Sequence, residues 1–202
     1  MKKYFLVLIS IFTTASAIGQ SFCWSNVYLD GFTGVNFVNN GVGEAHINLK
    51  TGYALGAAMG YRFTRFFCLE AEGSFRENRI SALHFDDAVF VTSGHLYSIS
   101  AICNGILEVP LLRNGLIPYV GFGLGHQWEH LHFIIDPVAT QEGFYIFDSC
   151  LTNSYGLAYQ GIIGMTFMKR QKFQIGGEYR FLNQFHTVPG NHTLDMKLKW
   201  LF

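Results

Sequence analysis

The sequence predicts an all-β protein, an eight-stranded antiparallel transmembrane up-and-down β-barrel that follows an N-terminal signal peptide. Three observations support this fold class. Apolar and polar residues alternate along eight segments, and helical periodicity is scarce. The composition is also unusual for a soluble domain, with 14% charged residues and 22 glycines among 202 residues. The formal net charge of zero gives no basis for a nucleic-acid partner.

The first residues are typical of a secretory signal peptide. Lys2 and Lys3 form a positive start, an apolar stretch follows over 4–12, and residues 15–17 form a small-residue cleavage site. The apolar stretch is shorter than the roughly 20 residues of a membrane-spanning helix. We therefore expect residues 1–19 to be the signal peptide and residues 20–202 to form the barrel domain.

Eight later segments alternate between large apolar residues and small or polar ones. Within 66–76, for example, Leu69 and Phe75 share one face, whereas Glu70, Glu72 and Arg76 share the other. Successive side chains of a strand point to opposite faces, so each segment has an apolar face and a polar one. The predicted strands are 27–38, 50–63, 66–76, 95–108, 118–129, 154–167, 172–181 and 192–202.

Short and long connections alternate along the chain. The short ones lie at 64–65, 110–117 and 169–171, and the mostly longer ones at 39–49, 77–94, 130–151 and 183–191. Outer-membrane barrels have short periplasmic turns and longer outer loops. We therefore expect both termini on the periplasmic side and the longer connections outside the cell.

The orientation of the two faces follows from the cost of burying charge. An unpaired charge in a dry soluble core costs several kcal/mol, yet charges of both signs share the faces opposite the large aromatics. Apolar side chains should therefore face lipid, and the charges should pair inside a barrel whose lumen is plugged by side chains. The predicted lumen charge network is Arg62, Glu70, Glu72, Arg76, Glu108, Glu178, Arg180, Lys197 and Lys199.

Four segments resemble the small eight-stranded outer-membrane barrel family of the opacity-protein and outer-membrane protein A or X type, with its porin-like fold. They are 28–37, 118–125, 176–181 and 197–202. The resemblance implies insertion in the bacterial outer membrane, among lipids and lipopolysaccharide. It also implies that barrel assembly machinery recognises a last strand of alternating hydrophobic residues that ends in Phe. The matching residues are Met196, Leu198, Trp200 and Phe202.

The resemblance implies a non-enzymatic surface protein with a structural or adhesive role, whose loops contact a host or surface ligand. We expect a monomer with no cofactor and no catalytic residue. Two alternatives remain open. A lipid A-modifying enzyme would need a nucleophile beside the outer-rim histidines, such as Ser93, Ser98 or Ser154. A soluble lipocalin-like carrier would place the aromatics inside the barrel and the charges outside.

Histidine has an uneven distribution in this chain. All eight histidines fall in or beside the predicted outer loops: His46, His84, His95, His126, His130, His132, His186 and His192. The same loops are rich in acidic residues, and their basic residues are mainly Lys50 and Arg79. Solvated rim imidazoles explain the run from His126 to His132 without a transition metal, so no metal site is predicted. A further hypothesis is that the acidic loops bind divalent cations or lipopolysaccharide counter-ions, with a response near about pH 6 from the histidines.

The four cysteines form no close pair in the sequence. Cys103 is predicted to face lipid, and Cys150 is predicted to lie in an outer loop. Cys23 and Cys68 both fall near the periplasmic end, where the sequence is compatible with a disulfide and equally with free thiols.

Overall fold

The computed structural model describes residues 26–38, 45–85, 88–109, 116–135, 139–140, 143–144, 150–169, 172–185 and 190–202. The predicted signal peptide and Cys23 lie outside these residues. The described strands are β1 (Val27–Val38), β2 (Ala45–Leu49), β3 (Gly52–Arg62), β4 (Phe67–Phe85), β5 (Ala88–Glu108), β6 (Ile117–Ile135), β7 (Ala139–Thr140), β8 (Gly143–Phe144), β9 (Cys150–Lys169), β10 (Phe173–Gln184) and β11 (Asn191–Leu201). A search of the described residues finds no helix long and apolar enough to cross a membrane.

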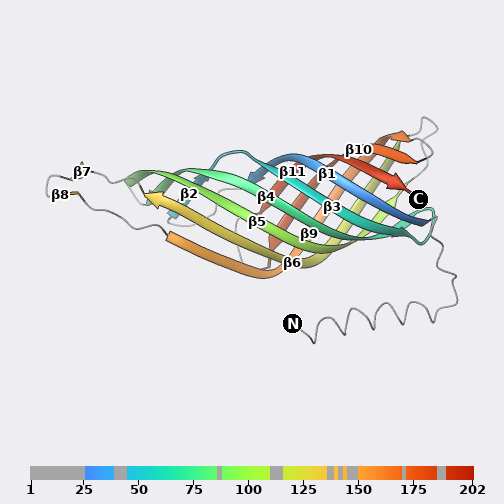
Figure 1. Ribbon diagram of the computed structural model, residues 1–202, viewed down its shortest axis with the longest axis horizontal. Coiled ribbons are helices and arrows are strands. Elements are labelled where there is room, and N and C mark those ends of the chain that lie inside the picture. Colours follow the sequence, from blue (N-terminus) through green and yellow to red (C-terminus); the bar gives the residue numbers. More distant parts are fainter. Residues whose placement is uncertain are drawn as a thin grey trace.

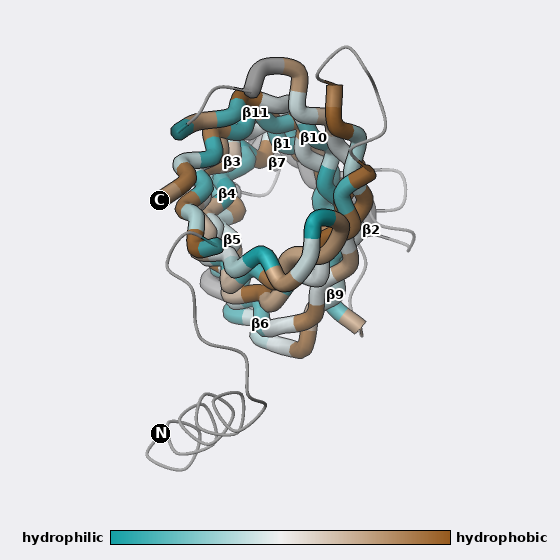
Figure 2. Tube along the Cα trace, turned by 90° about the vertical axis from the view of Figure 1, so that its right-hand side faces the viewer, coloured by the Kyte–Doolittle hydropathy of each residue, from teal (hydrophilic) through white to brown (hydrophobic). Residues whose placement is uncertain are grey.

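Eight of these strands form a closed antiparallel barrel. Around the ring the order is β1, β3, β4, β5, β6, β9, β10 and β11, and each strand pairs with the next. The first and last strands close the ring, with Tyr28 opposite Leu201 and Val38 opposite Asn191. Figure 2 shows the closed ring from one end. β2 pairs with β4 alone, and β7 pairs with β8. The structure therefore confirms the predicted eight-stranded barrel.

The polar faces of the strands point inward and the apolar faces point outward. Met196 and Trp200 are 58% and 47% exposed, whereas Glu72 and Lys199 are 4% and 6% exposed. The other exposed large hydrophobics, among them Leu55, Phe122 and Ile163, also lie on the outer face. This confirms the predicted orientation and rules out the lipocalin-like carrier, in which the apolar residues would lie inside.

Glycines give three aromatic rings room on the inner wall. The ring of Tyr119 covers Gly164 on the neighbouring strand, where a Cβ atom would lie 2.4 Å from the ring. Phe32 covers Gly56, and Tyr28 covers Gly60, in the same way. The glycines of the strands thus allow large side chains to lie flat inside a narrow barrel.

Four wall strands are much longer than the other four. β1, β3, β10 and β11 have 11–12 residues, close to the roughly 9–11 that span a bilayer. In contrast β4, β5, β6 and β9 have 19, 21, 19 and 20 residues. The additional length of about eight residues corresponds to about 25 Å of strand. Figure 1 shows these four strands continuing beyond the others at the end opposite the C-terminus.

This extension corrects the predicted outer loops. Residues 77–94 and much of 130–151 were expected to be irregular, but β4 and β5 pair as far as Phe85 and Ala88, and β6 pairs with β9 as far as Phe133 and Cys150. The prediction of irregular structure in these loops was wrong because the sequence alternates clearly only where one face of a strand meets hydrocarbon. Beyond the membrane both faces can be polar, and backbone pairing continues without that signal.

The two ends of the barrel differ as the connection lengths predict. The short connections 63–66, 109–116 and 170–172 join the strands at the end where β1 begins and β11 ends. The projecting ends of β4, β5, β6 and β9 lie at the other end (Figure 1). This is the end where the sequence analysis expects the outer loops.

Candidate functional site

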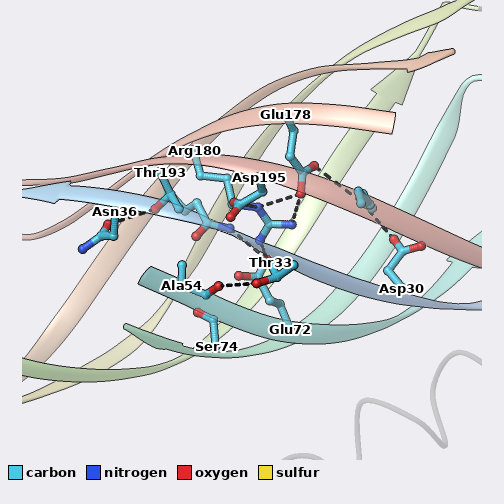
Figure 3. A network of polar contacts seen from close by, with 12 residues as sticks. Asp30, Thr33, Asn36, Ala54, Glu72, Ser74, Glu178, Arg180, Thr193 and Asp195 are labelled. Atoms are coloured by element: carbon cyan, nitrogen blue, oxygen red, sulfur yellow. Dashed lines mark hydrogen bonds and ion pairs between the residues drawn. The ribbon is translucent and has the colours of Figure 1, made fainter. Parts of the chain in front are cut away.

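Arg180 on β10 forms the centre of a charge network in the lumen. Its guanidinium lies 2.5 Å from a carboxylate oxygen of Glu72 and 3.4 Å from one of Asp195, and it also pairs with Glu178. Figure 3 shows these three carboxylates converging on Arg180. β10 and β4 are opposite each other in the ring, so the pair with Glu72 crosses the full width of the barrel. Burial of a charge is tolerated when it is paired and hydrogen-bonded in this way.

Two lysines of β11 form the rest of the network toward the periplasmic end. Lys197 Nζ lies 2.9 Å from Asp30, 3.4 Å from Glu70 and 3.7 Å from Glu178. Lys199 Nζ lies 2.9 Å from Glu108, which also pairs with Arg62 at 2.8 Å. Because β11 is opposite β5, the Lys199–Glu108 pair is a second contact across the lumen.

The hydrogen bonds of Arg76 go to neutral hydroxyl groups, and an amide cluster lies near the end of β1 that is farther from the C-terminus. Arg76 donates to the hydroxyl oxygens of Ser74 and Ser100 at 2.9 and 3.3 Å. Asn36 donates to Asn78 and Asn191 across three strands. The predicted interior residues thus all line the lumen, but Arg76 donates to the hydroxyl oxygens of Ser74, Ser100 and Thr193, and it forms no ion pair with the described residues.

Several members of this network were missed by the sequence analysis. Asp30 and Asp195 are buried and paired with Lys197 and Arg180, and Tyr28 and Tyr119 donate hydrogen bonds to Glu70 and Glu178. The alternation on the first and last strands already puts both aspartates on the polar face. The alternation likewise puts Tyr119 on the inner face of its strand, but it does not indicate that the tyrosine hydroxyls donate to Glu70 and Glu178.

The three inward rings also contact the cations. The Arg180 guanidinium lies 3.6 Å from the ring centroid of Phe32, Lys199 Nζ lies 4.1 Å from that of Tyr28, and Lys197 Nζ lies 5.5 Å from that of Tyr119. Each ring therefore lies between a glycine and a cation. Such contacts stabilise a desolvated cation by about 0.5–2 kcal/mol.

A second cluster lies on the outer face at the upper edge of the apolar surface. The Tyr53 hydroxyl donates to Glu77 at 2.6 Å, and His95 Nδ1 lies 2.8 Å from the other Glu77 oxygen. Tyr97 stacks on His95 with ring centroids 5.7 Å apart.

The structure agrees with the predicted strand positions of His95, His126 and His192, and it places His46, His84, His130 and His132 on strands where loops were predicted. His95 lies on β5, His126, His130 and His132 lie on β6, and His192 lies on β11. His46 and His84 belong to β2 and β4, and His186 lies outside the described residues. His126 stacks on Trp128, and His130 contacts Asn153. Among the described residues no group of three or more His, Cys, Asp or Glu side chains could hold a metal ion.

Two of the three candidate serine nucleophiles do not lie beside the outward histidines. Ser98 is buried and accepts a hydrogen bond from Gln127, and Ser154 donates to Gln184, so both face the lumen. His126 and His130 are exposed on the opposite face. The side chain of Ser93 lies outside the described residues.

The remaining predicted residues are placed as follows. Met196, Leu198, Trp200 and Phe202 are all exposed on the outer face. Cys68 is a buried free thiol, and Cys103 is a free thiol exposed on the outer face, as predicted. Cys150 begins β9 rather than lying in a loop.

Comparisons with known proteins agree with this architecture. No protein-family model matches the chain. A curated protein of Gluconacetobacter diazotrophicus named Outer membrane protein is 28% identical over 139 residues, which are 66% of this chain and 36% of the relative. The chain thus spans little more than a third of the length of that relative.

Two solved structures share the fold. Neisserial surface protein A has a TM-score of 0.55 and 14% identity, over 88% of this chain and 98% of that one. The attachment invasion locus protein Ail of Yersinia pestis has a TM-score of 0.50 and 17% identity, over 87% of this chain and 97% of that one. The chain therefore has the fold of the small eight-stranded outer-membrane β-barrels, and the bacterial outer membrane is its location.

Proposed function

We propose that this outer-membrane barrel is a non-enzymatic surface protein, in which a plugged barrel anchors a projecting sheet that contacts molecules outside the cell. The observation that carries the proposal is the length of β4, β5, β6 and β9. Their additional residues lie on the side of the long connections. A protein that served only to span the membrane would not need them.

The projecting strands form a sheet rather than separate loops. β4 pairs with β5, β5 with β6 and β6 with β9 over almost their full lengths, and β2 extends the sheet on the far side of β4. A paired sheet presents a fixed surface, which reduces the entropy lost when a partner binds. Neisserial surface protein A and Ail are named as a surface protein and an attachment protein, which agrees with a role in contact.

The plugged lumen is supported by the contacts that cross the barrel. Arg180–Glu72 and Lys199–Glu108 each join opposite strands, and Gln160 on β9 donates to Glu72 on β4. Side chains that meet in the middle of an eight-stranded barrel leave little room for a channel. We propose that the network serves stability and keeps the lumen closed to solutes.

A non-enzymatic role is supported by the outer rim. In the described residues the exposed His126 and His130 contact Trp128 and Asn153, and the hydroxyls of Ser98 and Ser154 point to the other face. We further propose that the protein is a monomer, because the ring closes within one chain.

Removal of the tip of the projecting sheet tests this function. Ile80 and Gly94 are cross-strand partners, so residues 81–93 can be replaced by an Asn-Gly turn that preserves the register below. We expect the shortened protein to reach the outer membrane and to keep heat-modifiable gel migration. Attachment of intact cells to polystyrene and to cultured animal cells should fall to the level of cells without the protein.

The matched control changes the opposite end of the barrel. Arg65 and Lys172 are exposed at the short turns, and their joint replacement by alanine should leave attachment unchanged. Attachment that survives removal of residues 81–93 would contradict the proposal. A lipid A mass that changes when the protein is expressed would favour the enzyme instead.

A further inference from the structure

The outer face of β4, β5 and β6 carries a row of cationic and imidazole side chains just above the apolar surface. We propose that this row binds the phosphate of an anionic outer-leaflet lipid. It consists of Arg79, His95 and His132, with Lys50 beside it, and is called the basic row below. The proposal depends on the outer-membrane location but not on the proposed attachment function.

Strand register brings the members of the basic row together. Arg79 on β4 is the direct partner of His95 on β5, and His95 is the direct partner of His132 on β6. Direct cross-strand partners have Cβ atoms about 4.5–5.5 Å apart. All three residues share the strand parity of the lipid-facing residues below them, and Arg79 is exposed. Three positions far apart in the sequence therefore form one surface.

Lys50 joins the basic row from the connection between β2 and β3. Its backbone N–H donates to the carbonyl oxygen of Arg79 at 2.7 Å, and the residue is exposed. In the sequence Lys50 and Arg79 are isolated basic residues among acidic ones. In the fold they are neighbours, which concentrates positive charge at one place on the rim.

The height of the basic row matches the lipid headgroups. Phe75, Ile99 and Trp128 form the last apolar cross-strand row, and the basic row lies two rows above it. Rows that face the same way are about 6.6 Å apart along a strand, so tilted strands raise the basic row about 10 Å above that apolar row. Lipid phosphates lie in the polar layer just above the hydrocarbon.

Among the described outer-facing residues, Glu77 is the carboxylate next to the basic row, and both of its oxygens already have partners. Glu77 lies in the row below, and its two oxygens contact the Tyr53 hydroxyl and His95 Nδ1. The contact fixes the His95 ring and leaves Nε2 for a ligand, to which a protonated ring donates. Within the described part of the chain neither Arg79 nor Lys50 forms an ion pair.

These groups suit a phosphate rather than a carboxylate or a neutral sugar. A guanidinium donates two parallel hydrogen bonds to phosphate oxygens, and lysine and imidazolium add further charged donors. On the other side of the barrel, near the ends of β10 and β11, the described contacts on the outer face are aromatic ones among Tyr159, Phe181, Phe185 and His192. The basic row is therefore confined to the side that carries the projecting sheet.

Binding of lipid A to the folded full-length barrel in detergent tests the proposal. Three probes are compared by native mass spectrometry: lipid A, the same lipid without its phosphates, and inorganic phosphate. We expect lipid A to bind most tightly. Replacement of Lys50, Arg79, His95 and His132 by glutamine should weaken lipid A binding about tenfold or more, because it removes the charged donors to the lipid phosphate.

The control His126→Gln changes an exposed histidine on the same face, three cross-strand rows below the basic row. It should alter the affinity for lipid A less than about twofold.

A second variant is used if the quadruple variant does not fold, as judged by heat-modifiable migration. Arg79→Lys alone keeps the charge but loses the paired hydrogen bonds, so it should weaken lipid A binding several-fold. The proposal is overturned if the dephosphorylated lipid binds as well as lipid A, if the variants bind lipid A like the wild type, or if inorganic phosphate binds as tightly as the lipid. None of these results would bear on attachment, which is measured on cells.

Discussion

At the scale of single residues, Arg180 shows how the barrel holds buried charge. Its side chain is almost fully buried, covers Phe32 on one side and contacts Glu72, Glu178 and Asp195. The alternation of β10 predicts that Arg180 faces inward. It does not predict the partners, which come from three different strands.

Replacement of Arg180 by leucine should destabilise the barrel strongly. The change leaves Glu72 and Asp195 without their cation and Glu178 with the more distant Lys197, and breaking a buried pair in this way costs about 3–5 kcal/mol. The measurement is the free energy of unfolding in guanidinium chloride, with the protein in liposomes. Lys172→Leu removes an exposed cation at a short turn and should change that free energy by less than about 0.5 kcal/mol.

A partner substitution makes this prediction specific to the ion pair. Glu72→Leu added to Arg180→Leu removes one of the unpaired carboxylates, so the double variant should be more stable than Arg180→Leu alone. If the double variant is only as stable as Arg180→Leu, an unpaired Glu72 is not the cause of the lost stability.

At the scale of elements, the last strand combines two roles on its two faces. Lys197 and Lys199 point inward to the charge network, and Met196, Leu198, Trp200 and Phe202 point outward. The outward residues are the proposed signal for barrel assembly. β11 also pairs with β1 and closes the ring, so the proposed signal lies on the strand that completes the barrel.

Phe202→Ser should reduce the amount of protein in the outer membrane several-fold in cells. The physical reason is that the terminal ring is exposed and is available to the assembly machinery. The purified variant should still refold into detergent, because an exposed substitution changes stability by about 0.5 kcal/mol or less. The matched control, Phe185→Ser, changes an exposed ring at the opposite end of the barrel and should leave the amount unchanged. An equal loss for both variants would argue against a terminal signal.

The long strands show where element prediction failed. Residues 95–108 were predicted as a strand from alternation, and the structure extends that strand back to Ala88. The part of this strand within the membrane, 95–108, faces hydrocarbon on one side, so its sequence must alternate. The part that projects beyond the membrane, 88–94, has no such constraint, and its pairing with β4 and β6 shows it to be strand.

At the scale of the whole molecule, the barrel combines a closed wall, an interior crossed by ion pairs and a one-sided extension. The wall closes between the two ends of the described chain, and the interior contacts join opposite strands. The extension belongs to four consecutive wall strands, which makes the outer end asymmetric (Figure 1).

A plugged lumen predicts that the protein does not form open pores. We expect the purified barrel in planar bilayers to show no steady conductance above that of the bilayer alone, because pairs that cross an eight-stranded barrel leave little room for ions to pass. A preparation heated until it unfolds is the control for contaminating pores. Stable, long-lived openings from the folded protein that the heated sample lacks would contradict the prediction.

The sequence by itself determined the fold class, the position of the eight strands in the membrane and the face that each residue occupies. It could do so because lipid on one side and charge on the other impose alternation on each strand separately, which is a local property. The tertiary structure alone decided which charges pair across the lumen, that Lys50, Arg79, His95 and His132 form one row, and how far the strands project. These features depend on register between strands distant in the sequence, and one strand carries no information about the neighbour opposite it.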